Sequence, residues 1–574
     1  MGTEYGNLRR LPNEIVLQIL LCLDDVSLSN CLRVCKSLSR CILETAALRY
    51  VLELAWHGYV DGPLTSGGPH ATKAARLQAF RKYMHSWDTL SWTETRVLIP
   101  RLSSYEIGGG VYAAAEKNAL WCIELPSPLR ARSSNDFTFN PKQDLLIAVE
   151  LKEIAGEDYA DANAASWKPV AHVLSFRTGL PHPSASNHLM PEICANIGLM
   201  QMRIMGNLYG LLCPVATDDK AGFVVYEWDT GKKLLSVMLE SDATSFTFVD
   251  ERHVIMPSDL KVNPLKDTNL TLYRMEDSGL VAIALFEFPD LADSHHTTIL
   301  DIASDPSPNI AAGQYEHSDN PSPFEINNKR TIWVHWAIWD EFIPHEGNLD
   351  DNLKEFNLVI HTDELVKLAL SPPSSDARVQ FLPADDMGGT AAVRCYDWNM
   401  WGPKLALMMP RKNVPSNNFE CFMHGSRQVA LEEHSEIVYT DWSCVRYPIP
   451  SWLEHHPNSG VPSFEEALSR DLAVEPFSKD TNVFGYLFQD SFHSAPMTCR
   501  TQRRRLLKPL DPVGTAANGV MVDAENIVLF EESPDKGMVE MIILTIGGAE
   551  PTAEDLEESR KRELMSCGWR TDQC

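Results

Sequence analysis

Four residues form the tightest group that could bind a metal ion: Asp293, His295, His296 and Asp301. Carboxylate and imidazole groups are common metal ligands. Adjacent histidines on an extended chain point to opposite sides, however, so at most one of them could reach a shared ion without a turn. We therefore interpret this segment as a polar surface loop.

Motifs that perform chemistry are missing from the sequence. It contains no GxxxxGKS/T phosphate loop, no GxSxG nucleophile turn and no HExxH pair. Asp158, Asp161 and Asn163 lack the glycine and the distal glutamate of a calcium loop, which makes a solvated turn the better interpretation. We predict that the chain is not an enzyme and has no cofactor and no metal site.

Two other groups of side chains could recognise a partner. The aromatic group could form an interaction surface, although packing between sheets is the favoured interpretation. The basic group fits a nuclear localisation signal or a basic surface loop. The aromatic group is Trp333, His335, Trp336, Trp339, Trp398 and Trp401, and the basic group is Arg500, Arg503, Arg504, Arg505 and Lys508.

Composition restricts the class of protein. A chain of 574 residues with a formal charge of −28 is too long for one compact core and disfavours nucleic acid and anionic membranes as partners. No stretch approaches the ~18 apolar residues of a membrane span. The 13 cysteines include no CxxC pair, which favours free thiols in a reducing compartment. We expect the protein to be located in the cytoplasm, the nucleus or both.

The first sixty residues carry helical signals. Pro12 suits a first helical turn, and Glu14 favours the positive end of the helix dipole. Ile15, Ile19 and Leu23 then recur four residues apart. Asp24, Asp25 and Ser27 indicate a break and a cap, and apolar residues from Leu38 to Trp56 predict a longer third helix. Three short helices give a thin core that gains stability from a partner.

The segment LPNEIVLQILLCLDDVSLSNCLRVCKSL resembles the F-box motif in residue type and spacing. Asp24 and Lys36 also match the motif, whereas Leu38 stands where the family often has Trp. The resemblance implies docking on a Skp-type adaptor that binds a cullin scaffold; an unrelated three-helix bundle is the alternative. The implied adaptor-binding residues are Leu11, Pro12, Glu14, Ile15, Ile19, Leu20, Leu23, Leu28, Val34 and Cys35.

The remainder changes from helical to strand patterns. A Gly/Pro/Ser-rich loop at 64–69 precedes a helical pattern over 74–87. Beyond residue 100, the segments 137–149 and 246–256 each predict two strands around a polar turn. Strand-turn-glycine segments end at Gly179, Gly231 and Gly279, a period of about fifty residues that is typical of β-propeller blades. A pair of β-sandwich domains is the alternative.

Later segments extend the same interpretation. Strands are expected at 331–338, 356–361, 404–409, 436–445 and 526–545, with loops at 350–354 and 450–463, and roughly six or seven blades fit the length. The segments WDTGKKL, WVHWAIWDEF and DWNMWGPKLALM also resemble large F-box proteins of basidiomycete fungi. That resemblance implies an F-box followed by a divergent propeller-like domain.

These observations predict an α+β multidomain protein. A three-helix F-box at 8–57 and a linker with a connecting helix at 58–100 precede a mainly β, propeller-like domain at 101–548 and a tail at 549–574. The function implied is substrate recognition in a Skp-cullin-F-box ubiquitin ligase, with an unidentified protein as substrate. The alternative is an F-box scaffold that does not direct ubiquitin transfer. We also expect residues from about 101 onward to fold without the helices.

Overall fold

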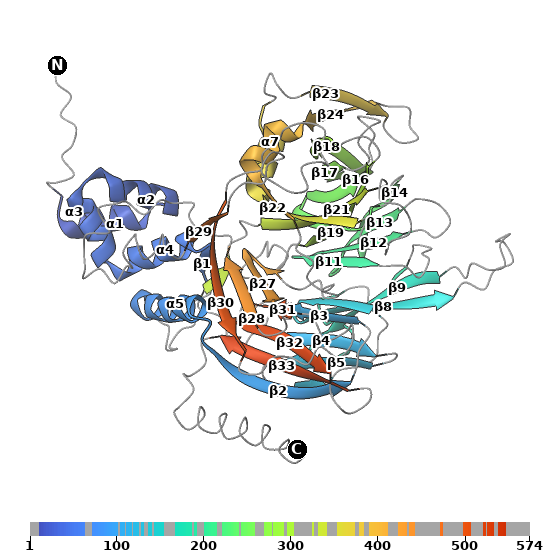
Figure 1. The fold of residues 1–574 in the computed structure, drawn as a ribbon, viewed down its shortest axis with the longest axis horizontal. Coiled ribbons are helices and arrows are strands. Elements are labelled where there is room, and N and C mark those ends of the chain that lie inside the picture. Colours follow the sequence, from blue (N-terminus) through green and yellow to red (C-terminus); the bar gives the residue numbers. More distant parts are fainter. Residues whose placement is uncertain are drawn as a thin grey trace, which may run out of the picture.

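A computed structural model describes residues 11–546 apart from several gaps. The amino-terminal helices, in blue, lie at one end of the molecule and strands make up most of the larger body beside them (Figure 1). Among the described residues, no helix is long and apolar enough to cross a membrane. The gaps are 63–71, 101–103, 109–110, 117–118, 125–127, 131–135, 141–142, 154–166, 186–188, 192–199, 215–220, 240–242, 259–268, 278, 292–294, 304–323, 327–330, 341–352, 373–377, 384–389, 411–422, 433–435, 442–470, 475–496, 507–519, 524 and 533–537.

The amino-terminal module contains four helices. Pro12 precedes the first, and the Asp24 carboxylate accepts a hydrogen bond of 2.7 Å from the backbone N–H of Ser27 at the start of the second. These contacts confirm the predicted start and break. The helices are α1 (Asn13–Leu21), α2 (Asp25–Val34), α3 (Lys36–Glu44) and α4 (Ala46–Trp56).

The prediction of a single long third helix is wrong. Thr45 has an extended backbone (φ −88°, ψ 109°), which ends α3 and begins α4. A β-branched side chain loses rotamer freedom inside a helix, so threonine is a favourable place for this break. The break lets α3 and α4 lie on different sides of one core. That core is made of Leu20, Leu28, Leu32, Ile42, Leu48 and Leu52, each at most 3% exposed.

The next elements connect the helices to the strands. A short strand, β1 (Tyr59–Asp61), is followed by α5 (Lys73–Asp88). The predicted connecting helix over 74–87 is therefore confirmed. The side chain of Thr72 accepts a hydrogen bond of 3.2 Å from the N–H of Ala75 and caps the start of α5.

Seven sheets of four or more strands follow in the described part of the chain, each built mainly from antiparallel neighbours in a β-propeller arrangement. The first three are β3 (Ser104–Gly108), β4 (Val111–Glu116), β5 (Ala119–Glu124) and β6 (Pro128–Arg130); β7 (Asp136–Asn140), β8 (Leu145–Glu153), β9 (Trp167–Ser175) and β10 (Leu189–Pro191); and β11 (Gln201–Met205), β12 (Leu208–Pro214), β13 (Ala221–Glu227) and β14 (Lys232–Leu239).

The fourth to seventh sheets complete the series. They are β15 (Thr247–Asp250), β16 (His253–Ser258), β17 (Asn269–Glu276) and β18 (Gly279–Glu287); β19 (His295–Ala303), β21 (Thr331–Asp340), β22 (Leu353–His361) and β25 (Ala406–Pro410); β26 (Met423–His424), β27 (Arg427–Glu432), β28 (Glu436–Asp441) and β30 (Met497–Arg505), with β29 (Asp471–Val474) at the edge; and β31 (Val520–Val522), β32 (Asn526–Glu532), β33 (Met538–Ile546) and β2 (Trp92–Pro100).

The predicted fifty-residue period is confirmed in the backbone. The backbone φ angles of Gly179, Gly231 and Gly279 are positive, at 65°, 69° and 137°. Residues other than glycine rarely adopt such angles. Segments 137–149 and 246–256 each contain two antiparallel strands, β7 with β8 and β15 with β16. The described part of the chain forms seven successive sheets, and the last takes its outer strand from Trp92–Pro100, whereas a pair of β-sandwich domains would contain four sheets, so the β-sandwich alternative is wrong.

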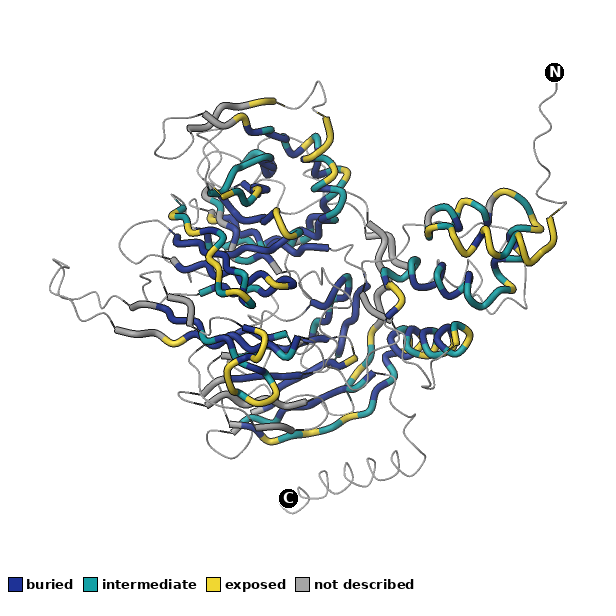
Figure 2. The backbone as a smooth tube through the Cα atoms, turned by 180° about the vertical axis from the view of Figure 1, so that it is seen from behind, coloured by how far each residue is buried: buried dark blue, intermediate teal, exposed yellow. Residues whose placement is uncertain are grey.

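Buried side chains join successive sheets. One cluster carries Phe223 and Phe248 from the third and fourth sheets, and another carries Tyr112 and Phe530 from the first and seventh. The dark blue of buried residues accordingly runs through the inner strands of the body (Figure 2). Hydrophobic contact between blades is the interaction that stabilises a propeller.

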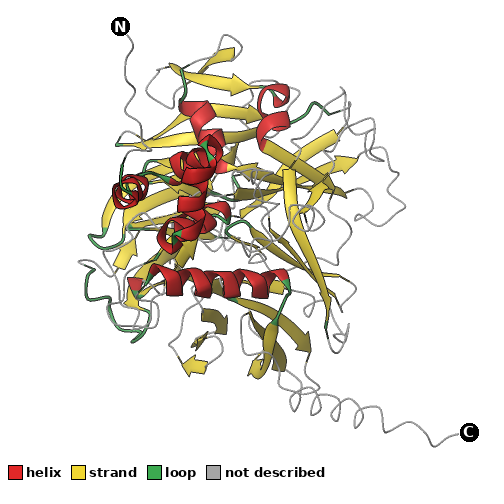
Figure 3. Cartoon of the chain, turned by 90° about the vertical axis from the view of Figure 1, so that its left-hand side faces the viewer, coloured by secondary structure: helices red, strands yellow, loops and turns green. Residues whose placement is uncertain are grey.

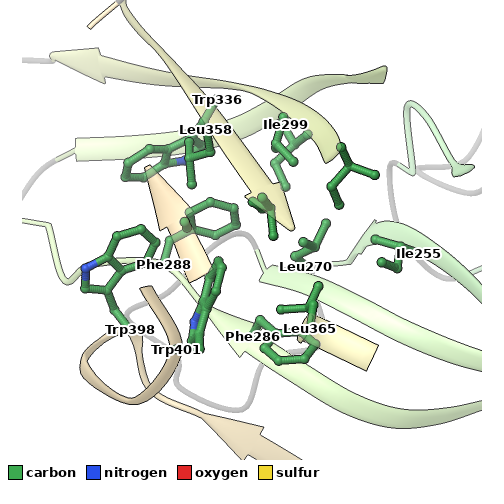
Figure 4. Packing of buried hydrophobic residues seen from close by; sticks show 14 of the residues in the cluster. Ile255, Leu270, Phe286, Phe288, Ile299, Trp336, Leu358, Leu365, Trp398 and Trp401 are labelled. Atoms are coloured by element: carbon green, nitrogen blue, oxygen red, sulfur yellow. The ribbon is translucent and has the colours of Figure 1, made fainter. Parts of the chain in front are cut away.

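The tryptophan-rich group lies mainly between the fourth and fifth sheets. Trp336, Trp398 and Trp401 are each at most 3% exposed and pack around Phe286 and Phe288 (Figure 4). This confirms packing as the role of these three. Trp339 is 40% exposed on β21.

Some elements differ from their predicted type. Two helices, α6 (Thr362–Leu370) and α7 (Trp398–Leu405), and a hairpin of β23 (Arg378–Pro383) and β24 (Thr390–Tyr396) lie between β22 and β25. Lys404 therefore lies in the last turn of α7 rather than starting a strand, and β24 adds to β18 in parallel. The expected loop at 450–463 lies outside the described residues.

The predicted boundary at residue 101 is wrong. Trp92–Pro100, assigned to the linker, pairs along its whole length with β33 and forms the outer strand of the seventh sheet. Arg96 on β2 also donates a hydrogen bond of 2.9 Å to Glu540 on β33. The β domain is thus closed by a strand that precedes its expected start.

A truncation pair tests this closure. A fragment that begins at residue 58, and so contains β2 and the whole β domain, should fold with a β-type circular dichroism spectrum and a cooperative thermal transition. One that begins at residue 101 loses β2 and exposes the edge of β33, so its melting temperature should fall by about 5 °C or more, or it should aggregate. Equal melting temperatures for the two fragments would show that β2 does not close the domain.

Candidate docking surface on the amino-terminal helices

Large apolar side chains remain exposed on the amino-terminal module. Because monomeric proteins seldom leave such side chains grouped on one element, an exposed group indicates a contact surface. Ile15 and Ile19 lie four residues apart on α1 and therefore share one side of that helix. The exposed fractions are 41% for Leu11, 40% for Ile15, 43% for Ile19, 51% for Leu21 and 68% for Val34. We call Ile15, Ile19 and Leu11, which comes just before the helix, the exposed apolar surface; Leu21 lies on another side of α1 and Val34 ends α2.

The residues implied as adaptor-binding divide into two sets. Leu11, Pro12, Glu14, Ile15, Ile19 and Val34 are exposed, and Leu23 and Cys35 are half-buried. Leu20 and Leu28 are 3% and 1% exposed and belong to the core of the module. A partner could touch the first set directly, whereas Leu20 and Leu28 can act only by holding the helices in place.

Helix α4 contributes to two cores from opposite sides. Leu48 and Leu52 pack into the core of the amino-terminal module. Tyr50 and Leu54 pack instead against Phe80 and other side chains of α5 and β1. Figure 3 views the molecule from the side of the amino-terminal helices, which lie in front of the strands. The exposed apolar surface is therefore carried by a module whose last helix is also part of the connection to the propeller.

Ion pairs reinforce the contact between α4 and α5. Glu53 is 9% exposed and accepts hydrogen bonds of 2.8 Å from Arg49 and 2.8 Å from Arg81. The hydrogen bond to Glu53 raises the pKa of Arg81. On β1, Asp61 accepts a hydrogen bond of 2.6 Å from the buried Arg76. Buried charges are costly unless paired, so the Glu53–Arg81 pair orients α5 on α4 and the Arg76–Asp61 pair orients α5 on β1.

Other predicted candidates have different surroundings. His295 and His296 lie in β19, so the interpretation of that segment as a loop is wrong, and Asp293 is outside the described residues. In the described part of the chain, no group of three or more His, Cys, Asp or Glu could hold a metal ion. Asp158, Asp161 and Asn163 lie outside that part.

The basic group is also not a loop. Arg500, Arg503, Arg504 and Arg505 lie in β30, where Arg503 forms an ion pair of 3.2 Å with Glu436 on β28. Lys508 lies outside the described residues. A run of basic residues in a strand places alternate side chains on opposite faces, which a count of charges along the sequence does not reveal.

Six cysteines in the described residues are free thiols. Burial raises the pKa of Cys31, so its thiol stays protonated and packs as a small apolar group. Cys22 is exposed at the end of α1.

A family model described as F-box-like matches residues 8–51. Comparison with curated proteins finds no match.

Three solved structures show a distant likeness. The N-terminal domain of Nup159 is 12% identical, covers 79% of this chain and 95% of its own, and has a TM-score of 0.31. The hydrazine synthase of Kuenenia stuttgartiensis is 8% identical over 75% and 93% of the two chains, with a TM-score of 0.33. The Dos1 propeller is 10% identical over 79% and 94%, with a TM-score of 0.30. Scores this low carry no argument, so the propeller arrangement rests on the strand pairing of the chain itself.

Two substitutions distinguish the core of the module from its exposed apolar surface. Leu28→Ala should lower the free energy of unfolding of the helices by about 2–5 kcal/mol, because it leaves a cavity. Ile19→Ala should lower it by about 1 kcal/mol or less, because Ile19 is 43% exposed. Amide hydrogen exchange of α1–α4 in the full chain measures the loss of stability in each variant. An equal loss of protection from exchange in the two variants would contradict the division into core and exposed surface.

Proposed function

We propose that this chain, which carries an F-box-like domain at residues 8–51, is the substrate-recognition subunit of a Skp-cullin-F-box ubiquitin ligase. The exposed apolar surface on that domain carries the proposal. It is the face that would bind the Skp-type adaptor, and the adaptor would in turn bind the cullin scaffold. The propeller would hold a protein substrate.

In this role the chain supplies position and leaves the chemistry to its partners. A bound substrate is held near the ubiquitin-charged enzyme of the complex, which raises the effective concentration of its lysine side chains. The chain itself would then need no catalytic group and no cofactor. Its free thiols fit the reducing conditions of the cytoplasm and the nucleus, where we propose that it acts.

The adaptor contact can be tested at the two residues that lead into α1. Leu11 is 41% exposed and Pro12 is exposed at the helix start, so changing both should remove contact area without opening the core. Truncating an interface anchor costs ~2 kcal/mol or more, which is about a thirtyfold loss of affinity. Leu11→Ala with Pro12→Ala should therefore abolish co-purification of the Skp-type adaptor. Leu180→Ala, at a 51% exposed leucine of the propeller, is the matched control and should not. Adaptor retention at wild-type level by the folded double variant would refute the docking face.

Ubiquitin transfer needs a separate measurement. Wild-type chain and the double variant are purified from cells in which the proteasome is inhibited, and the bound proteins are compared. Substrates should bind both forms but gain ubiquitin only with the wild type. Partners that bind both forms and never gain ubiquitin would favour the scaffold alternative.

A further inference from the structure

Arg427 occupies an unusual position for a charged side chain. It is the first residue of β27 in the sixth sheet, and it is only 1% exposed. Its guanidinium carbon lies 4.6 Å from the ring centre of Trp87, 5.1 Å from that of Tyr83 and 5.2 Å from that of Tyr59. Two of these rings belong to α5 and the third to β1. A cation from the propeller is therefore held by aromatic rings of the connecting segment.

Hydrogen bonds make this contact directional. One guanidinium nitrogen of Arg427 donates to the hydroxyl of Tyr83 at 2.6 Å, and the other approaches the sulfur of Met84 at 3.6 Å. The hydroxyls of Tyr83 and Tyr59 are 3.3 Å apart. Burial raises the pKa of Tyr59 well above its ordinary value, so its hydroxyl stays protonated. A planar guanidinium with fixed donors fits such a set of partners in one orientation.

A second arginine of the same sheet holds the end of α5. The guanidinium carbon of Arg504 on β30 lies 4.2 Å from the ring centre of Trp92, and one of its nitrogens donates to the carbonyl of Leu90. Leu90 has a left-handed backbone (φ 47°) although it is not glycine, and its side chain is 1% exposed. Strained backbone of this kind persists only where the surrounding structure fixes it.

The same segment also contacts a connection between two strands of the fifth sheet. Strand β1 pairs in antiparallel fashion with β20 (Phe324–Ile326), with Val60 opposite Glu325. β20 lies between β19 and β21 along the chain, so it belongs to a connection within the fifth sheet. In the seventh sheet, Trp87 and Trp92 share a hydrophobic cluster with Ile527 and Ile546. The connecting segment is thus held by the sixth and seventh sheets and by a connection between strands of the fifth.

We propose that Arg427 is a positioning residue, which locks the F-box-like domain and the propeller into one relative orientation. The lock itself is a property of the chain alone. Its consequence, that a bound substrate faces the ubiquitin-charged enzyme at a fixed distance, rests on the function proposed above. An apolar side chain of similar volume could fill the same space, but it would not reproduce the oriented hydrogen bond and ring contacts that select one arrangement.

Distance measurements on the full chain test the lock. Nitroxide labels are attached through unnatural amino acids at Arg40 on α3 and Lys232 on β14, both exposed, so that native cysteines stay unlabelled. The wild-type chain should give one narrow distribution of the distance between the two labels, measured by double electron-electron resonance. Arg427→Met should at least double its width, and Arg427→Lys should fall between the two. Arg274→Met removes a 44% exposed arginine from β17 and is the matched control, with wild-type width expected.

A second variant guards against misfolding of the sixth sheet. Tyr83→Leu removes the same hydrogen bond and ring contact from the α5 side, where Tyr83 is half-buried, and should broaden the distribution as Arg427→Met does. A broad wild-type distribution, or a folded Tyr83→Leu variant with wild-type width, would overturn the lock.

The positioning role has its own readout. In cells with the proteasome inhibited, Arg427→Met should retain the adaptor and the proteins bound by the propeller, while the ubiquitin carried per bound protein falls by about threefold or more. Unchanged ubiquitin with a broadened distance distribution would overturn the positioning role. Absence of ubiquitin transfer by the wild type would count against the proposed function and leave the distance result standing.

Discussion

The pairing of β2 with β33 is the constraint on which the rest of the molecule depends. It joins Arg96 and Glu540, which are 444 residues apart in the sequence, and makes the first strand of the body the outer strand of its last sheet. Since α5 ends at Asp88, immediately before β2, the helices are attached at the closing sheet. Closure of the body and placement of the helices are consequently set by the same short stretch of chain.

Helix α4 extends that connection to the exposed apolar surface. A helix that buries one side usually leaves the other to solvent, but α4 packs Leu48 and Leu52 into one core and Tyr50 and Leu54 into another. The Arg81–Glu53 ion pair then joins α5 to α4, and the Arg76–Asp61 pair joins α5 to β1. Apolar packing supplies most of the stability here, and the charged pairs supply orientation.

Much of this architecture could be predicted from local signals. Pro12, the cap at Asp24 and the spacing of apolar residues indicated α1 and α2, and the glycines at 179, 231 and 279 indicated repeated hairpins. These features could be predicted because helix caps and positive φ angles depend on neighbouring residues in the sequence. The break at Thr45 was missed because a continuous apolar pattern runs through it.

Other features depend on residues far apart in the sequence and carry no local signal. Nothing around Trp92–Pro100 distinguishes a linker strand from the partner of β33. The division of the predicted docking residues into exposed Ile19 and buried Leu20 depends on where α4 lies, which periodicity alone does not fix. In the sequence, Arg427 is a single basic residue with no signal for its contacts. Only the fold brings Tyr59, Tyr83 and Trp87 around it.

The closing strand also has a consequence for synthesis on the ribosome. At ~5–20 residues per second, the 444 residues between the partners take roughly 20 to 90 s to emerge. During that interval β2 has left the ribosome while its partner has not been made, so its edge and the apolar side chains that it will bury stay open to other chains. The nascent protein therefore passes through a long stage in which chaperones, rather than its own carboxyl-terminal strands, must keep the first strand from pairing wrongly.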